Sequence, residues 1–152
     1  MTTDCIAQRV LFPHLAEKPI SVQMDQAHSS SDGGALLLKA IDDELGLTER
    51  LSACLRDARA PGKVRHSVQE FLRQRVFGIA LGYPDANDAK ALSGDPILKL
   101  CLDRDPIAGT PLASQPTLSR FENAAGSVDL YRMGEALLDC VIARHRRRRR
   151  GR

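Results

Sequence analysis

The feature that most constrains the fold is the close succession of helix start and stop signals between residues 32 and 127. Ser67-Val68-Gln69-Glu70 is a capping box, in which the serine and the glutamate each bond the other's backbone N–H. Asp95-Pro96 combines an aspartate cap with a proline at the first helical position, and Gly46 and Gly82 are typical helix stops. Signals this close together allow only short helices. The sequence therefore predicts a mainly α fold, a compact multi-helix domain with one short N-terminal strand.

The caps and stops divide the chain into expected elements. We expect helices at residues 32–45, 48–57, 67–81, 85–92, 95–102, 114–124 and from 127 onward. The expected caps of the remaining helices are Asp32, Thr48, Asp85, Ser114 and Ser127. Ile20, Val22 and Met24 alternate with polar residues and predict a strand that has no obvious partner.

The helix at residues 67–81 is expected to be central, because it carries a broad apolar face. That face comprises Val68, Phe71, Leu72, Val76, Ile79 and Ala80. Arg73 and Gln74 lie off this stripe. In the last helix the expected apolar stripe comprises Leu130, Tyr131, Leu137, Leu138, Val141 and Ile142.

Length and charge distribution bound the class of protein. A chain of 152 residues with 43% hydrophobic residues is long enough for one domain with a core. The net charge of +3 conceals an uneven distribution, because seven of the 22 basic residues are arginines in residues 144–152. The remaining 15 basic residues face 19 acidic ones, so the body is mildly acidic. A basic end on an acidic body favours a polyanion-binding tail over a uniformly basic surface.

Cysteine spacing and hydropathy indicate where such a chain would reside. Cys5, Cys54, Cys101 and Cys140 are far apart and form no zinc-binding pattern, which favours buried free thiols in a reducing compartment. No apolar run reaches the roughly 20 residues of a membrane span, and the N-terminus lacks the layout of a signal peptide. We expect a cytoplasmic protein without a membrane partner.

Four separated segments resemble a known family. They are Ser31-Asp32-Gly33-Gly34-Ala35-Leu36-Leu37-Leu38, Val64-Arg65-His66-Ser67-Val68, Gly82-Tyr83-Pro84-Asp85-Ala86-Asn87-Asp88 with Leu92-Ser93-Gly94-Asp95-Pro96, and Leu112-Ala113-Ser114-Gln115-Pro116-Thr117-Leu118-Ser119-Arg120-Phe121-Glu122-Asn123. In this order they resemble the N-terminal half of a bacterial insertion-sequence transposase of the DDE type. The resemblance covers most of the chain, from about residue 29 to residue 123.

The resemblance implies that DNA binding and catalysis lie in different regions of a longer protein. It implies DNA as partner, at transposon ends, and transposition by a Mg²⁺-dependent ribonuclease-H-like core whose first catalytic aspartate lies beyond this region. We therefore expect a truncated or partial transposase without a catalytic residue, a metal ligand or a cofactor of its own. The expected units are an irregular arm at residues 1–28, the helical domain at residues 29–143 and an arginine-rich tail at residues 144–152.

The candidate DNA-reading residues lie at the start of the helix at residues 114–124. Glutamine can pair with adenine, arginine with guanine, and hydroxyl groups with phosphate. The candidate set is Gln115, Thr117, Ser119, Arg120 and Asn123, with Leu118 and Phe121 on the opposite side as anchors. An alternative is that Thr117, Arg120 and Asn123 brace a helix junction beside the missing core.

The same segment also resembles, over a short stretch, the recognition helix of helix-turn-helix repressors. A stand-alone helix-turn-helix regulator, a homodimer on a palindrome, is therefore the competing function. The third possible interpretation is a helical remnant that has no binding function. The loop at residues 103–111 is longer than a helix-turn-helix turn.

Two further charged segments have alternative interpretations. The arginine run Arg146, Arg147, Arg148, Arg149 and Arg150 exceeds what a helix dipole needs, and contact with phosphates would relieve its self-repulsion. It could equally be a linker exposed by truncation. The acidic cluster of Asp85, Asn87, Asp88 and Asp95 could ligate Mg²⁺, but helix capping explains these positions better. The loop at residues 58–66 is basic and is expected to be solvated rather than bound to phosphate.

Overall fold

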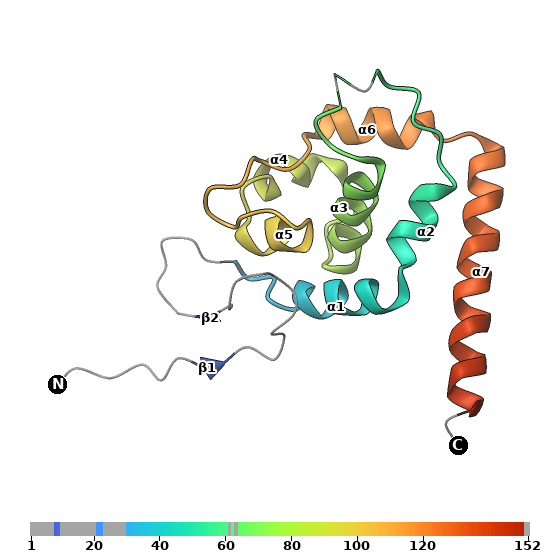
Figure 1. Ribbon diagram of the computed structural model, residues 1–152. Helices are drawn as coiled ribbons and strands as arrows, with labels where there is room; N and C mark the ends of the chain where they lie inside the picture. Colours follow the sequence, from blue (N-terminus) through green and yellow to red (C-terminus); the bar gives the residue numbers. More distant parts are fainter. Residues whose placement is uncertain (1–7, 10–20, 23–29, 61, 63, 151–152) are drawn as a thin grey trace.

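The chain folds as a cluster of short helices with one long helix at its edge (Figure 1). The computed structural model describes residues 8–9, 21–22, 30–60, 62 and 64–150. Its elements are β1 (Gln8–Arg9), β2 (Ser21–Val22), α1 (Ala35–Leu45), α2 (Leu47–Ala53), α3 (Val68–Ala80), the 3₁₀ turn η3 (Ala86–Asp88), α4 (Ala89–Leu92), α5 (Pro96–Cys101), α6 (Gln115–Ala124) and α7 (Ser127–Arg150). The predicted mainly α class is confirmed.

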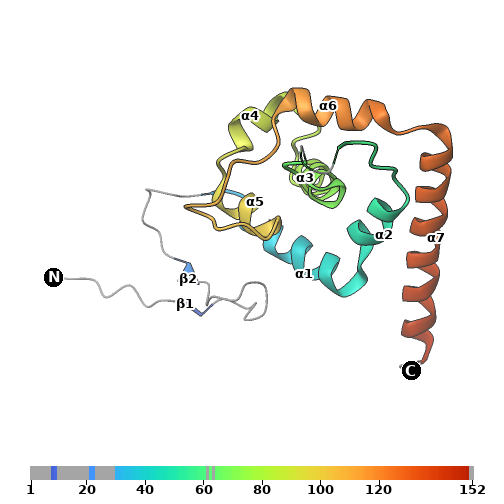
Figure 2. The same cartoon turned by 45° about the horizontal axis from the view of Figure 1, so that its top comes forward.

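Helix α3 lies at the centre of the cluster. Figure 2 looks nearly along its axis and shows α1, α2, α4, α5 and α6 arranged around it. The predicted capping box starts this helix: the Glu70 N–H donates to Ser67 Oγ at 3.1 Å, and the Ser67 N–H donates to Glu70 Oε2 at 2.6 Å. The helix ends at Ala80, and Gly82 follows in the left-handed region at φ 96°, where glycine meets no steric cost.

The core has two parts, and both include residues of α3. One part joins α1, α3 and α5 and comprises Ala35, Phe77, Leu98, Cys101, Leu102 and Leu112. The other joins α3, α4 and α6 and comprises Phe71, Ala89, Ala113 and Leu118, with Phe121 packed against it. Burial raises the pKa of the Cys101 thiol to about 12, so this cysteine behaves as a small apolar residue.

The buried face of α3 differs from the predicted one. Phe71, Leu72, Gln74, Phe77 and Gly78 are buried, whereas the predicted core residues Ile79 and Ala80 are exposed. The buried set covers a wider arc of α3 than the predicted stripe, because other elements pack around the helix on several sides. Gln74 was predicted to lie off the apolar face, and this was wrong.

The predicted side-chain caps at Asp32 and Thr48 are also wrong. The Asp32 side chain does not cap α1 but accepts a hydrogen bond from the Tyr83 hydroxyl at 3.1 Å. Thr48 lies inside the first turn of α2, where its N–H and hydroxyl both donate to Asp42 at 2.8 and 2.5 Å. Gly46, left-handed at φ 61°, ends α1 as predicted and immediately precedes α2. Helix α2 then ends at Ala53 rather than near residue 57.

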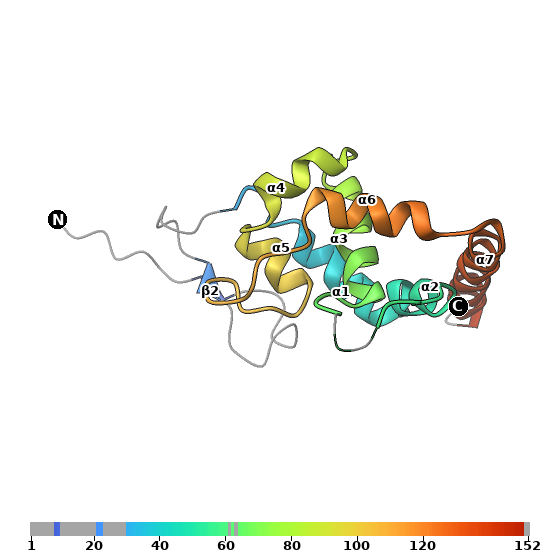
Figure 3. The same ribbon diagram turned by 90° about the horizontal axis from the view of Figure 1, so that it is seen from above.

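Helix α7 stands at the edge of the molecule beside α2 (Figures 1 and 3). Its half-buried residues recur at helical spacing and are Asp129, Met133, Ala136 and Cys140. The predicted apolar stripe lies elsewhere on the helix and is exposed throughout. The helix begins at Ser127, but the side-chain cap comes from Asp129, whose Oδ2 accepts from the Gly126 N–H at 3.1 Å. The expected cap by Ser127 is therefore wrong.

The predicted N-terminal strand is present at Ser21–Val22 and has a partner. It pairs antiparallel with Gln8–Arg9, in the register Gln8 to Val22 and Arg9 to Ser21. The rest of the predicted arm at residues 1–28, and Cys5 within it, lies outside the described residues. Of the described cysteines, Cys101 is buried, while Cys54 and Cys140 are half-buried, and all three are free thiols.

Candidate nucleic-acid interface

A buried glutamine fixes the segment that leads into α6. Gln74 Nε2 donates to the Ala113 carbonyl at 2.9 Å, and the Ala113 N–H donates to Gln74 Oε1 at 3.0 Å. Gln74 is only 7% exposed and Ala113 is 1% exposed. The side-chain amide therefore satisfies both backbone polar groups of a buried residue, as a neighbouring strand would.

Three residues of α6 hold the helix against the rest of the domain. Leu118 is 1% exposed, and the Phe121 ring lies 4.9 Å from the Phe71 ring, so the predicted apolar anchors are confirmed. Glu122 forms an ion pair with Arg75 of α3. Arg75 also donates to the Pro84 carbonyl at 3.0 Å, which links α6 to the turn after α3.

The hydrogen bonds of the candidate DNA-reading residues remain within α6 and its cap. Gln115 Nε2 donates to Ser119 Oγ at 3.1 Å, and Arg120 Nε donates to the Pro116 carbonyl at 3.0 Å. Thr117 shares a hydrogen bond with the hydroxyl of Ser114, 3.0 Å away, and Ser114 occupies the cap position without bonding a backbone N–H through its side chain. Arg120 and Asn123 are exposed, and the other three candidates are half-buried.

A groove borders the start of α6. It has a volume of about 440 Å³ and is lined by Asn87, Lys90, Ser93, Pro111, Leu112, Ser114, Gln115 and Pro116. Apart from Pro111, these residues come from the Gly82–Pro96 segment and from the segment that begins at Leu112. Two of the segments that carry the family resemblance thus meet at one surface, beside Gln115.

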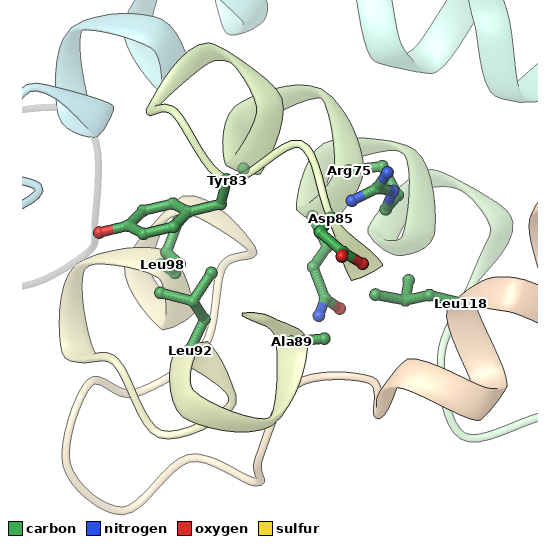
Figure 4. A pocket seen from close by; sticks show the side chains of 9 residues that line it. Arg75, Tyr83, Asp85, Ala89, Leu92, Leu98 and Leu118 are labelled. Atoms are coloured by element: carbon green, nitrogen blue, oxygen red, sulfur yellow. The ribbon is translucent and has the colours of Figure 1, made fainter. Parts of the chain in front are cut away.

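A second cavity, close to Gln74, is too small to bind a substrate. Its volume is about 10 Å³, and Leu92, Leu98, Ala89 and Leu118 close around it (Figure 4). A single water molecule needs about this much space. The cavity is therefore a packing defect between α3, α4, α5 and α6 rather than an active site.

The arginine run continues α7. The helix extends to Arg150 without interruption, and Arg146, Arg147 and Arg149 are exposed. Arg144 forms an ion pair with Glu44 of α1 at 3.0 Å, although both side chains are largely exposed. Arg152 lies outside the described residues.

The arginine run lies far from α6. Helix α7 leads away from α6 (Figure 1), and a helix rises about 1.5 Å per residue, so Arg146 lies roughly 29 Å along the helix from Ser127. The two candidate DNA-contacting sets therefore lie at opposite ends of α7.

The helix-turn-helix arrangement is absent at α6. Helix α5 ends at Cys101 and α6 begins at Gln115, with the turn-rich loop of residues 103–111 between them. In that motif a turn of three or four residues joins the two helices. The spacing does not favour a helix-turn-helix regulator.

The carboxylates of the predicted acidic cluster serve helix starts. Asp85 Oδ1 accepts from the Asn87 N–H at 2.9 Å, and Asp95 Oδ1 accepts from the Leu98 N–H at 2.8 Å. Asp88 lies in η3, at the start of α4. Negative charge at these positions is favoured by the helix dipole.

Arg73, which the sequence interpretation left without a role, connects several elements. Its Nε donates to Asp42 Oδ2 at 3.2 Å in α1, and its Nη1 donates to Asp103 Oδ2 at 2.6 Å in the loop after α5. The same Nε lies 3.2 Å from the Thr48 hydroxyl in α2. Lys39, which is 4% exposed, adds a second cation 3.1 Å from Asp103. A helix-face pattern gave no signal for this network, because the partners of Arg73 come from three other segments: α1, α2 and the loop after α5.

The carboxylates around Arg73 do not fit a Mg²⁺ site. Asp42, Asp43 and Asp103 are already paired with Arg73 and Lys39, whose positive charges would oppose a divalent cation. Within the part of the chain that the structure describes, no group of three or more His, Cys, Asp or Glu side chains is arranged to hold a metal ion. The Mg²⁺ that the family resemblance implies has no matching ligand set among these residues.

Arginines also organise the basic loop before α3. Arg59 forms a bidentate pair with Asp57, donates to the His66 carbonyl at 2.9 Å and lies over the Phe71 ring at 4.9 Å. The hydrogen bond from Arg59 lowers the pKa of Asp57 to about 2. Arg59 is thus engaged within the fold, whereas the loop was expected to be solvated, and Arg65 is exposed. Lys63 lies outside the described residues.

Comparison with known families decides the class of this chain. Residues 12–151 match the family described as Transposase DDE domain group 1. The chain belongs to this DDE transposase family. No curated protein and no solved structure matches the chain at a significant level. Among the described residues of this transposase chain, no helix is long and apolar enough to cross a membrane.

Proposed function

We propose that this chain is a DNA-binding region of an insertion-sequence transposase and that α6 contacts the transposon end. The proposal rests on a difference between two sets of residues in α6. Leu118, Phe121 and Glu122 hold the helix to the domain, whereas the hydrogen bonds of Gln115 and Arg120 stay within the helix. Side chains held this loosely can exchange local partners for base edges or phosphates at low cost.

The arginine run of α7 would supply a separate contact. Its exposed arginines have no acid within their own segment, since residues 144–152 contain none. Neutralising phosphates releases counterions from DNA and yields affinity without sequence preference. The candidate residues of α6 and the arginine run lie at opposite ends of α7. We therefore expect α6 to contribute sequence specificity and the arginine run to contribute general affinity for DNA.

The strand-transfer chemistry of the family is assigned, in this proposal, to acidic residues outside this chain. Three observations support the assignment: Asp85 and Asp95 cap helices, and Asp42 is bonded to Thr48 and Arg73. Two-metal catalysis needs carboxylates that converge on one point and are free to bind metal. On this proposal the chain binds DNA ends and does not itself cut them.

The test of α6 is a binding selection followed by matched substitutions. The wild-type chain is used to select bound duplexes from a randomised pool, and the selected and scrambled duplexes are then titrated. We expect Arg120→Ala to lose on the order of 1–3 kcal/mol on the selected duplex only. Arg132→Ala removes an exposed arginine from α7 and serves as the charge-matched control.

Two outcomes would count against this proposal. Equal losses on selected and scrambled duplexes would assign Arg120 to the phosphate backbone rather than to base readout. A lowered melting temperature with unchanged discrimination would support the alternative in which α6 braces a helix junction.

A further inference from the structure

The outer side of α7 carries a continuous apolar stripe that nothing in the described domain covers. Its members lie between Val128 and Ile142 and are Val128, Leu130, Tyr131, Leu137, Leu138, Val141 and Ile142. Tyr131 is 69% exposed, and Leu138 and Val141 are each 58% exposed. Scattered exposed apolar residues are ordinary, but a contiguous stripe of this kind marks an interaction surface.

The stripe and the domain-facing side occupy different faces of the helix. At about 100° per residue, Leu130, Leu137, Leu138 and Val141 fall within one arc, whereas Met133, Ala136 and Cys140 fall in a separate one. The latter three are half-buried, and α7 packs against α2. Packing against the domain therefore leaves the stripe available, and Gly134 in the middle of its arc permits a close approach by another helix.

The size of the stripe suits a second helix of the same kind. Seven large apolar side chains, each roughly half exposed, offer on the order of 600 Å² per copy, so a symmetric pair would bury about 1,200 Å², the lower limit of standard stable interfaces. A two-fold pair uses the same surface on both partners. An interface of this size predicts a reversible dimer rather than an obligate one.

The charges of α7 decide the orientation of such a pair. Residues 127–140 hold one arginine against three acids, Asp129, Glu135 and Asp139, whereas residues 141–150 hold six arginines and no acid. Parallel pairing would bring the two arginine runs together within a Debye length of about 8 Å. Antiparallel pairing along the stripe, with position 128 opposite position 142, places the two arginine runs at opposite ends of the paired helices and so removes this repulsion.

We propose that two copies of this chain associate through their α7 helices, packed antiparallel along the stripe. The proposal rests on the exposed apolar residues and on the charge distribution, and it holds whether or not α6 reads DNA.

The oligomeric state of the full chain tests the proposal, measured by sedimentation equilibrium in physiological salt. We expect a concentration-dependent dimer for the wild type. Leu138→Glu places a charge in the stripe at an exposed position and should weaken the dimer at least tenfold. Ala143→Glu introduces the same charge on an exposed position off the stripe of the same helix and should leave the dimer intact.

Circular dichroism should show an unchanged fold for both variants, because neither position is buried. A wild-type chain that stays monomeric up to several hundred micromolar would overturn the proposal. In that case another protein segment would be the candidate to cover the stripe. A Leu138→Glu chain that dimerises as well as Ala143→Glu would overturn it too.

Orientation is tested by disulfide trapping. Val128→Cys and Ile142→Cys chains should cross-link to each other when mixed, with peptide mapping to identify the joined cysteines. Each variant alone should not join position 128 to 128 or 142 to 142. Efficient self-linkage at both positions would show parallel pairing and would contradict the antiparallel arrangement.

Discussion

The side-chain amide of Gln74 in α3 bonds both backbone polar groups of Ala113, 39 residues further along the chain. This pair of hydrogen bonds sets where the chain turns into α6. It also explains why a polar residue occupies the middle of a buried helix face. The position of the candidate DNA-reading helix therefore depends on one glutamine in the central helix.

Replacing Gln74 should destabilise the domain more than the size of its side chain suggests. Gln74→Leu leaves the buried N–H and carbonyl of Ala113 without partners, at about 1–3 kcal/mol for each unsatisfied group. Urea denaturation measures the change in the free energy of unfolding. Gln69→Ala, a substitution in the first turn of the same helix, serves as the control and should cost much less. Equal losses for the two variants would remove the proposed role of the Gln74 amide.

The capping box predicts unequal and non-additive losses. Ser67→Ala should cost about 0.5–2 kcal/mol of stability. Glu70→Ala should cost more, because Glu70 also pairs with the half-buried Arg104, which bonds the Pro111 carbonyl at 2.7 Å. The double variant should lose less than the sum, since both residues act on one helix terminus. Full additivity in denaturant melts would argue against the reciprocal cap.

His66 should make the domain sensitive to mild acid. Burial lowers the pKa of His66, and the positive charge of Arg104 lowers it further. His66 Nδ1 lies 2.7 Å from Arg104 Nη2, and only the neutral imidazole can accept a hydrogen bond from this arginine. A histidine whose folded pKa is depressed stabilises the fold above its unfolded pKa of about 6.5. That stability is lost as the pH falls below 6.5 through the folded value.

The measurement is the free energy of unfolding between pH 7.5 and pH 5, with a His66→Gln chain as the comparison. The wild type should lose stability across this window faster than the variant. An NMR titration that places the pKa of His66 above 6.5 would contradict the assignment.

The purified chain should show no metal-dependent nicking of duplex DNA with Mg²⁺ or Mn²⁺. The reason is that Asp85 and Asp95 cap helices, while Asp42 and Asp103 pair with Arg73 and Lys39. Gel assays on supercoiled plasmid measure this directly. Nicking by the wild type that disappears in Asp85→Ala or Asp88→Ala would place catalysis in this chain after all.

The sequence predicted the elements that local signals define. The capping box at Ser67, the Asp95-Pro96 start and the left-handed Gly46 all act through neighbouring backbone groups, so residues a few positions apart contain the whole signal. Leu118 and Phe121 were also predictable, because helical spacing separates them from the polar side of α6.

Long-range pairings left no such signal. Gln74 and Arg73 follow the same spacing as surface residues, and only the fold shows that one meets Ala113 and the other meets Asp42. The same limit applies to α7, because an apolar stripe shows that a helix has a partner face but not which partner covers it. The exposed stripe became visible only when the rest of the domain was seen to pack against another side.

The most direct test of the account is the salt dependence of DNA binding, compared between the wild type and a chain in which Arg146 to Arg150 are replaced by alanine. Fluorescence anisotropy gives Kd for a selected and a scrambled duplex at several salt concentrations. We predict that the variant binds both duplexes more weakly, keeps the preference for the selected one, and loses about 0.9 from the log–log salt slope for each phosphate contact removed. A wild-type chain that binds neither duplex at low salt, or a variant with an unchanged slope and affinity, would contradict the account.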